Sequence, residues 1–267
     1  MTPLRSAGLS LVMVAVMLSA NAEEGGGQPE TAARLNAQLA IGYLKQGDVV
    51  TAREKVDKAL RQNERDSAVQ TAAALVFERL QERDVADRHY ALAVRLEPKN
   101  PELQNNYAVF QCRNGRPAEG QKLFEAAARN PAYGTPEVAY ANAGVCARAA
   151  GDTVKADSYF RRALELRSDF PDALLQLADL SYQKGSGLAA RGLLARYFQV
   201  APRTADALAL AVKVEKAQGD DAEARRYADE LQREYPDSPQ ARDLRGDRKS
   251  TRLNSSHIPL SRMPSSA

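Results

Sequence analysis

The sequence predicts an all-α fold, a solenoid of six helix-turn-helix units stacked into a right-handed superhelix, because a degenerate unit of 34 residues recurs over residues 33–238. Three features recur in phase with this unit. Small residues stand at two fixed positions, and a larger residue at position twenty-four of the first five copies fills the space beside them. A glycine ends the first half of five copies, at Gly47, Gly115, Gly151, Gly185 and Gly219. The sixth copy has Ala228 at position twenty-four, which indicates a thinner terminal unit.

Residues 1–22 have the pattern of a secretory signal rather than of a folded element. Arg5 precedes an apolar run over residues 9–18, and the small residues Ala20, Asn21 and Ala22 follow. This order is typical of a signal peptide cleaved after Ala22, and the apolar run is too short to span a bilayer. An amphipathic helix is the alternative, but it would not need three small residues in this order. We therefore expect export across the inner membrane of a bacterium.

A flexible lead-in is expected at residues 23–32, which include three consecutive glycines and a proline. In the copies that follow, apolar residues are spaced by three and four, as on one face of a helix. In the second copy, Ala74 and Phe77 share a face of the first helix, and Ala86 and Tyr90 share a face of the second. Each copy is therefore predicted to be a pair of helices.

The small positions identify the kind of repeat. Position eight is Ala40, Ala74, Ala108, Gly144, Ala178 and Val212, and position twenty is Ala52, Ala86, Gly120, Ala156, Ala190 and Ala224. Small residues at these two places, with a large residue at position twenty-four, resemble the tetratricopeptide repeat. The resemblance implies a concave face lined by the first helix of each copy, and this scaffold serves many different ligands.

The C-terminal end of the array is expected at residues 239–246, and the remaining residues 247–267 do not read as part of a fold. Asp247 to His257 spell DRKSTRLNSSH, which resembles the translation of a common sequencing-library adapter, so we interpret residues 247–267 as an adapter-derived artefact. A natural basic tail that binds nucleic acid is the rival interpretation. This tail carries +3 and the signal +1, so the whole-chain charge of +3 leaves 3 − 3 − 1 = −1 for residues 23–246. We therefore expect no nucleic-acid partner.

No combination of residues in the repeats predicts catalysis. Histidine occurs only at His89 and His257, so no histidine-based metal site or nucleophile-base pair can be assembled, and the glycines never cluster as a phosphate loop. His89 is most simply a residue on the surface of a helix. We expect neither a metal, a cofactor nor a small-molecule substrate, and we interpret the protein as a non-enzymatic binding module.

The two cysteines, Cys112 and Cys146, lie 34 residues apart, near equivalent points of the first helices of copies three and four. In an oxidising compartment this placement favours a disulfide. Two buried, unpaired thiols are the alternative. Adjacent helices usually pack about 8–10 Å apart, whereas a disulfide needs Cα atoms within about 7 Å.

The concave face is the remaining candidate for binding. Positions two, five, nine and twelve of each copy are expected to face it. Among the residues there, Ile41, Leu44, Leu75, Glu78, Asn105, Val109, Arg148, Asp179 and Tyr182 are candidate partner contacts. The first two copies are more apolar than a solvated face needs, so a peptide from a partner could place apolar side chains there, with Asn105 and Arg148 binding its polar groups. Packing of Ile41 and Leu44 against the lead-in is the alternative.

Three segments are more specific than the generic repeat. Residues 105–115 read NNYAVFQCRNG, residues 130–146 read NPAYGTPEVAYANAGVC, and residues 170–177 read FPDALLQL. Over roughly residues 33–241 the chain resembles the type IV pilus biogenesis and stability proteins, which act as pilotins for the outer-membrane secretin. The resemblance implies a periplasmic protein, associated with the outer membrane, that binds secretin subunits and has its two cysteines where Cys112 and Cys146 stand.

One departure concerns the lipid anchor. Members of that family are commonly lipoproteins whose signal ends in a Leu-x-Ala-Cys lipobox, whereas this chain has Asn21 in place of the cysteine after Leu18, Ser19 and Ala20. Because there is no thiol to acylate, we expect association with the outer membrane to be indirect, through the secretin or another partner. The alternatives are a periplasmic adaptor for cell-wall enzymes and an accessory domain for an enzyme on a separate chain.

Overall fold

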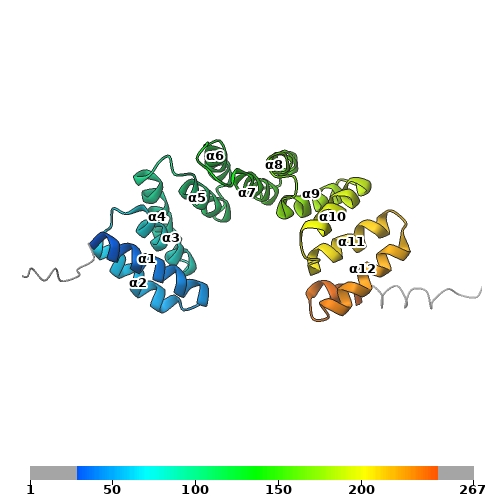
Figure 1. The fold of residues 1–267 in the computed structure, drawn as a ribbon, viewed down its shortest axis with the longest axis horizontal. Coiled ribbons are helices and arrows are strands. Elements are labelled where there is room, and N and C mark those ends of the chain that lie inside the picture. Colours follow the sequence, from blue (N-terminus) through cyan, green and yellow to red (C-terminus); the bar gives the residue numbers. More distant parts are fainter. Residues whose placement is uncertain (1–28, 246–267) are drawn as a thin grey trace, which may run out of the picture.

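The computed structural model describes residues 29–245, which form helices and no strand (Figure 1). Twelve helices are α1 (Pro29–Gln46), α2 (Val49–Gln62), α3 (Ser67–Arg79), α4 (Arg83–Leu96), α5 (Pro101–Arg113), α6 (Pro117–Ala128), α7 (Pro136–Ala149), α8 (Thr153–Leu166), α9 (Pro171–Gln183), α10 (Gly187–Val200), α11 (Ala205–Ala217) and α12 (Asp221–Glu234). A further helical segment occupies residues 239–245. Each odd-numbered helix packs against the even-numbered helix that follows it. These pairs are the six predicted units, so the prediction of an all-helical tetratricopeptide-repeat solenoid is confirmed.

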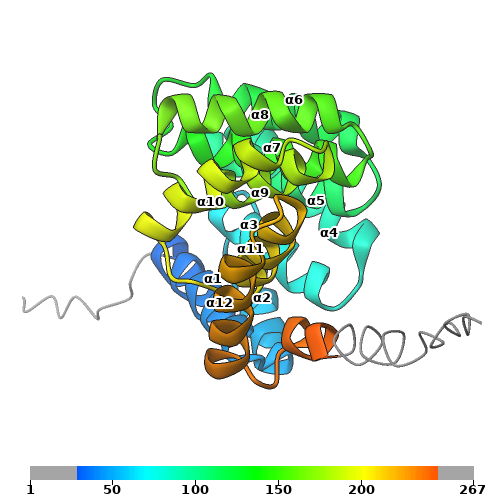
Figure 2. The same cartoon turned by 90° about the vertical axis from the view of Figure 1, so that its right-hand side faces the viewer.

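The pairs stack into an arch. Odd-numbered helices of neighbouring repeats pack against one another, as α1 does with α3 and α5 with α7. At the crown of the arch α5 and α7 lie on the inner side, and α6 and α8 lie on the outer side (Figure 1). The view turned by 90° shows α1, α2 and α12 at the foot of the arch and α6 and α8 at its top (Figure 2). The first helices of the repeats therefore line the concave face.

The array begins earlier than the sequence indicates. Helix α1 starts at Pro29, inside the segment 23–32 that was expected to be a flexible lead-in, and before the repeat boundary expected at residue 33. Proline is favourable in the first turn of a helix, where its missing N–H would have no partner, and Glu30 carries a negative charge that favours a helix N-terminus. Arg34 then ties this first turn to the next repeat, because its Nε donates to Asp66 at 2.6 Å.

The turns inside the repeats explain the recurring glycines. Gly47, Gly115, Gly151, Gly185 and Gly219 all have a φ between 76° and 82°, a left-handed conformation that glycine adopts without steric cost. The second copy has Gln81 at this place, with a φ of 64°. The turn therefore has the same shape in all six repeats, although one copy lacks the residue that suits it best.

Two glycines are needed for close packing instead. A Cβ on Gly144 would lie 2.6 Å from the ring of Phe160, and a Cβ on Gly120 would lie 2.9 Å from the carbonyl oxygen of Ala108. These glycines hold positions eight and twenty of their repeats. The two small positions are thus the points where paired helices touch.

The array also extends further than expected at its C-terminal end. Ala241 in the helical segment 239–245 is fully buried and packs with Leu208 and Leu231 of the sixth repeat. Without this segment the sixth repeat would expose the apolar face that Ala241 covers. The segment beyond Ser238 is therefore a cap on the array. The signal, the start of the lead-in and the adapter-like tail all lie outside the described residues.

Candidate functional site

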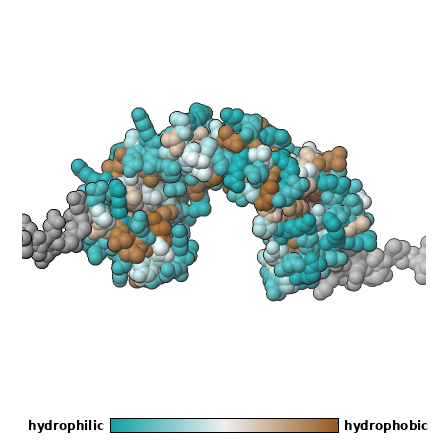
Figure 3. Space-filling model, viewed as in Figure 1, coloured by the Kyte–Doolittle hydropathy of each residue, from teal (hydrophilic) through white to brown (hydrophobic). Residues whose placement is uncertain are grey.

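The concave face changes character along the arch. Position nine of the repeat is, in order, Ile41, Leu75, Val109, Val145, Asp179 and Lys213. Position twelve is Leu44, Glu78, Cys112, Arg148, Tyr182 and Lys216. The first repeats therefore present apolar side chains to the inside of the arch, and the last repeat presents two lysines. In the space-filling view, apolar residues gather on the arm built by the first two repeats, and the arch is hollow beneath its crown (Figure 3).

An open groove of about 480 Å³ lies on the apolar arm, across α1, α3 and the end of α5. We call it the N-terminal groove. It is lined by Ile41, Leu44, Lys45, Leu75, Glu78, Arg79, Gln81 and Arg113. The structure thus brings together four of the predicted site residues. Ile41, Leu44 and Leu75 are half-buried against the core below them, so each leaves part of an apolar side chain open to the groove.

Glu78 at the wall of this groove is already engaged inside the molecule. Its carboxylate accepts a hydrogen bond of 2.9 Å from the hydroxyl of Tyr90 and lies 3.4 Å from the guanidinium of Arg113. Burial of the Tyr90 hydroxyl, together with the negative charge of Glu78, raises the pKa of Tyr90 above its ordinary value. Tyr90 therefore stays a neutral donor that fixes Glu78. Arg113, whose side chain is 69% exposed, is the more available charge for a partner.

The polar residues predicted for the middle of the face are also engaged within the chain. Asn105 accepts a hydrogen bond of 3.1 Å from Asn142. Arg148 donates to Gln176 at 2.8 Å and forms an ion pair with Asp179. These bonds join repeats three to four and four to five. Asn105, Arg148 and Asp179 therefore stabilise the stacking of the central repeats, which the sequence alone did not indicate.

Tyr182 lies apart from the N-terminal groove. It borders a second open groove, of about 930 Å³, between α9, α11 and residues 239–245. We call this the C-terminal groove. Its lining residues are Tyr182, Ala209, Val212, Lys213, Lys216, Ala217, Gln240, Arg242, Asp243 and Leu244. Of the predicted contacts, four thus line the N-terminal groove and Tyr182 lines the C-terminal groove, whereas Asn105, Val109, Arg148 and Asp179 line neither.

Val145 is an exposed apolar residue that the sequence prediction omitted. Its side chain is 47% exposed at position nine of the fourth repeat, in line with the half-buried Val109 of the third. Position nine is thus apolar in four consecutive repeats. Reading that position in every copy would have identified Val145. The basic residues Lys45, Arg79 and Arg113 at the N-terminal groove were also missed, because they stand next to the positions taken to face inward.

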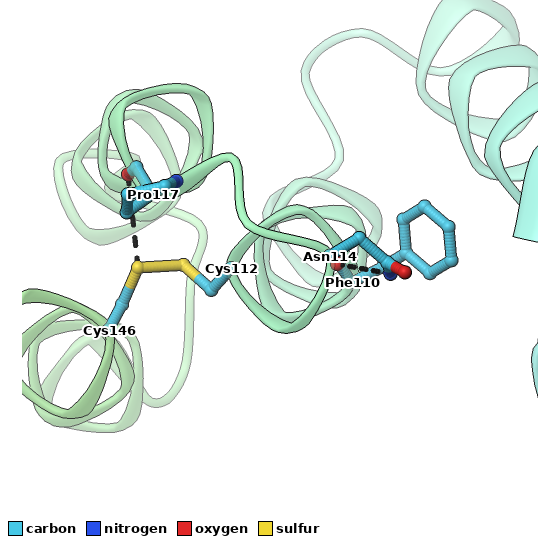
Figure 4. Close-up of a disulfide and its surroundings, with 5 residues drawn as sticks. All are labelled: Phe110, Cys112, Asn114, Pro117 and Cys146. Atoms are coloured by element: carbon cyan, nitrogen blue, oxygen red, sulfur yellow. Dashed lines mark hydrogen bonds between the residues drawn. A yellow bond between two sulfur atoms is a disulfide. The ribbon is translucent and has the colours of Figure 1, made fainter. Parts of the chain in front are cut away.

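A disulfide joins Cys112 of α5 to Cys146 of α7, as predicted (Figure 4). The two Cα atoms are 5.7 Å apart. Because Cα atoms lie about 2.3 Å from a helix axis, two that face each other are closer than the axes, and this resolves the conflict with normal helix spacing. The sulfur of Cys146 also lies 3.8 Å from the carbonyl oxygen of Pro117, a contact rather than a hydrogen bond because a disulfide sulfur carries no proton. The bridge therefore links repeats three and four at the crown of the arch.

His89 is not a surface residue, contrary to expectation. Its ring is half-buried, stacks on Phe77 at a centroid distance of 5.2 Å and lies 2.6 Å from the side-chain oxygen of Gln70. Since the amide nitrogen of Gln70 donates to the carbonyl oxygen of Glu64, the oxygen faces His89 and accepts its Nδ1 proton. Burial, with a smaller contribution from the charge of Arg88, lowers the pKa of His89. The histidine is thus a neutral structural residue that packs between α4 and α3 of the second repeat.

Within residues 29–245, no three side chains of the kinds that bind metals are grouped as a metal site would need. In the same part of the chain no helix is long and apolar enough to cross a membrane.

No family model matches the chain. It is 26% identical over 211 residues to the type IV pilus assembly protein PilF of Pseudomonas aeruginosa, covering 79% of this chain and 84% of that protein. It is 30% identical over 138 residues to an uncharacterised protein of Haemophilus influenzae, covering 52% of this chain and 75% of that protein. The fold is similar to the crystal structure of PilW, a widely conserved type IV pilus biogenesis factor, with a TM-score of 0.71, 29% identity, and coverage of 79% of this chain and 97% of that one. A structure of Pseudomonas aeruginosa PilF gives a TM-score of 0.70 at 26% identity, covering 82% of this chain and 99% of that one.

Proposed function

We propose that this chain, which is similar to PilF and PilW in sequence and fold, is a non-enzymatic periplasmic scaffold of type IV pilus biogenesis. It acts as a pilotin: it binds the subunits of the outer-membrane secretin and stabilises or localises them. The N-terminal groove carries this proposal, because it is an apolar surface built by two adjacent repeats that the rest of the described chain leaves open. A scaffold needs such an uncovered apolar surface to bind a protein partner.

The groove fits a peptide segment with apolar side chains. Ile41, Leu44 and Leu75 offer partly exposed aliphatic groups on adjacent helices, and burying one such side chain completely is worth about 1.5–3 kcal/mol. Lys45, Arg79 and Arg113 stand around these groups, so a segment that also carries acidic residues would be favoured. The contacts of Asn105, Val109 and Arg148 with the same partner remain part of the proposal, whereas Tyr182 lines the C-terminal groove and is not assigned to this partner. Of these, Val109 continues the apolar line from the groove toward Val145.

Two observations support a periplasmic location for the protein. The signal-like residues 1–22 favour export, and type IV pilus assembly is the process named for the similar proteins. Because Asn21 stands where a lipoprotein would have its cysteine, we propose that the protein associates with the outer membrane indirectly, through the secretin.

The test is a pair of aspartates in the groove. Ile41→Asp with Leu44→Asp places two charges where the partner would bury apolar groups, and should lower the affinity for purified secretin by several kcal/mol, or by at least about a hundredfold. Affinity is measured by surface plasmon resonance, and folding by circular dichroism. If the double variant unfolds, Leu44→Ser is used, because it removes apolar area without adding a charge.

A matched control adds the same charges elsewhere. Val50→Asp with Val154→Asp changes two valines that are 74% and 76% exposed in the first turns of α2 and α8, outside the groove. A negative charge suits a helix N-terminus, so this variant should fold and bind like the wild type. A folded Ile41/Leu44 variant that binds secretin at wild-type strength would remove the N-terminal groove from the proposal.

A further inference from the structure

Both grooves are lined by three cationic side chains and one carboxylate, but in the C-terminal groove lysines occupy the two inner positions that are aliphatic in the first repeat. Lys213 and Lys216 project from successive turns of α11 and both are exposed. They occupy positions nine and twelve of the sixth repeat, which are the positions of Ile41 and Leu44 in the first. Beside them the groove offers apolar surface from Tyr182, Ala209 and Leu244, which are half-buried.

The two lysines have no carboxylate partner among residues 29–245, although several carboxylates lie on the same elements. Asp179 is paired with Arg148, and Glu215 is buried in an ion pair with Arg191. Asp206 accepts a hydrogen bond from Gln240. Asp243 lines the groove but is balanced there by Arg242. The lining therefore carries a net charge of +2, from three cationic side chains and one carboxylate.

We propose that the C-terminal groove is a second protein-binding site, which takes an extended acidic segment of a partner. Its carboxylates pair with Lys213 and Lys216, and its aliphatic side chains cover Leu244 and Tyr182. Charge complementarity identifies the occupant, because the positive charge stands over an apolar floor inside a groove. A nucleic acid would need a wider basic surface, and residues 23–246 carry a net charge of −1. The site is separate from the one in the proposed function, so either can fail without the other.

The experiment uses a fluorescein-labelled peptide of about ten residues, which spans such a groove when extended. The peptide alternates glutamate and valine, and a second peptide has lysine in place of every glutamate. Fluorescence anisotropy with the full chain should show binding of the acidic peptide that weakens as salt is added, and no binding of the basic one. Failure of the acidic peptide to bind, or equal binding of the basic peptide, would overturn the proposal.

Two double variants locate the site. Lys213→Glu with Lys216→Glu should weaken binding of the acidic peptide at least about tenfold, because like charges then face each other. Lys58→Glu with Lys122→Glu makes the same change of charge at exposed lysines of α2 and α6, which lie outside both grooves, and should bind as the wild type does. Equal losses in both variants would show that overall charge, and not the groove, attracts the peptide. A single-stranded oligonucleotide that displaces the peptide from Lys213 and Lys216 would also contradict the assignment.

The Ile41→Asp, Leu44→Asp variant separates the two proposals. It should retain the acidic peptide at wild-type strength while losing the secretin. Loss of the peptide in this variant would place the acidic segment in the N-terminal groove and end the proposal of a second site.

Discussion

Repeats one and six have the same backbone but opposite inner surfaces. At positions nine and twelve, repeat one has Ile41 and Leu44, and repeat six has Lys213 and Lys216. At positions eight and twenty both repeats keep apolar residues that are fully or almost fully buried: Ala40 and Ala52 in repeat one, and Val212 and Ala224 in repeat six. The residues that join helix to helix are thus restricted by packing, whereas those on the inner surface are free to differ.

The middle of the arch differs from both ends. Its inner polar side chains bind one another: Asn142 donates a hydrogen bond to Asn105, and Arg148 forms an ion pair with Asp179. The Cys112–Cys146 disulfide lies in the same region. In the central repeats the inner side chains therefore connect neighbouring repeats, whereas at the two ends the inner surfaces stay open. This contrast teaches that position in the array, as well as residue type, separates structural from binding residues.

The largest expected effect comes from breaking the centre. Cys112→Ser with Cys146→Ser should lower the free energy of unfolding by about 2–4 kcal/mol, because the bridge closes a loop whose ends are 34 residues apart. Urea denaturation with and without a reductant measures the loss. The wild type should fall to the level of the variant when reduced, and the variant should be insensitive to reductant.

Both grooves should remain intact in this variant, since neither contains a cysteine. Secretin and acidic peptide should therefore bind with unchanged affinity. A folded variant with altered affinity at either groove would show that the two ends are coupled through the crown, and the separation drawn above between centre and ends would be wrong.

The fold was predictable because it repeats. Each defining position is sampled six times, so a single exception, such as Gln81 in place of glycine or Val212 in place of alanine, does not hide the pattern. The ends of the array were less predictable. Pro29 and the segment 239–245 belong to no complete copy, so the repeat pattern does not sample them. The segment 239–245 is held in place because Ala241 packs against Leu208 and Leu231.

The candidate site was predictable only in its repeat positions. Spacing placed Ile41, Leu44 and Leu75 on one surface, and they do line one groove. Spacing could not show that Glu78 accepts a hydrogen bond from Tyr90 or that Arg148 pairs with Asp179, because these bonds depend on side-chain geometry. Spacing also predicted that Tyr182 shares one surface with the other contacts, whereas Tyr182 lines the C-terminal groove.

A smaller effect, on peptide affinity, is expected when repeat six receives the inner residues of repeat one. Lys213→Ile with Lys216→Leu gives repeat six the inner residues of repeat one, and should weaken the acidic peptide about fivefold, since each exposed ion pair is worth about 0.2–1 kcal/mol. Secretin affinity should not change. The anisotropy assay and surface plasmon resonance measure the two affinities, and Lys58→Ile with Lys122→Leu is the control. An exchange that leaves peptide affinity at the wild-type level would mean that these positions do not set the chemistry of the groove.

The smallest effect is a loss of local stability at low pH, which we expect near His89 in repeat two and not in repeat six. The pKa of His89 in the fold is lowered from its ordinary value of 6.5, so the unfolded chain takes up a proton more readily than the folded one. The contribution of His89 to stability is therefore present above this ordinary value and is lost as the pH falls through it. Asp66 and Glu97 have lowered pKa values and titrate only in more acidic solution, so they do not change charge in this window.

Hydrogen exchange at about pH 7.5 and about pH 5.5, corrected for the intrinsic exchange rates, measures this difference. Acidification should reduce protection in α3 and α4, where His89 contacts Phe77 and Gln70, more than in α11 and α12. His89→Gln keeps a donor for Gln70 but cannot gain a charge, so it should remove the difference between the arms. If the variant loses protection in α3 and α4 to the same extent, the acid sensitivity of the N-terminal arm arises from another group and not from the buried imidazole.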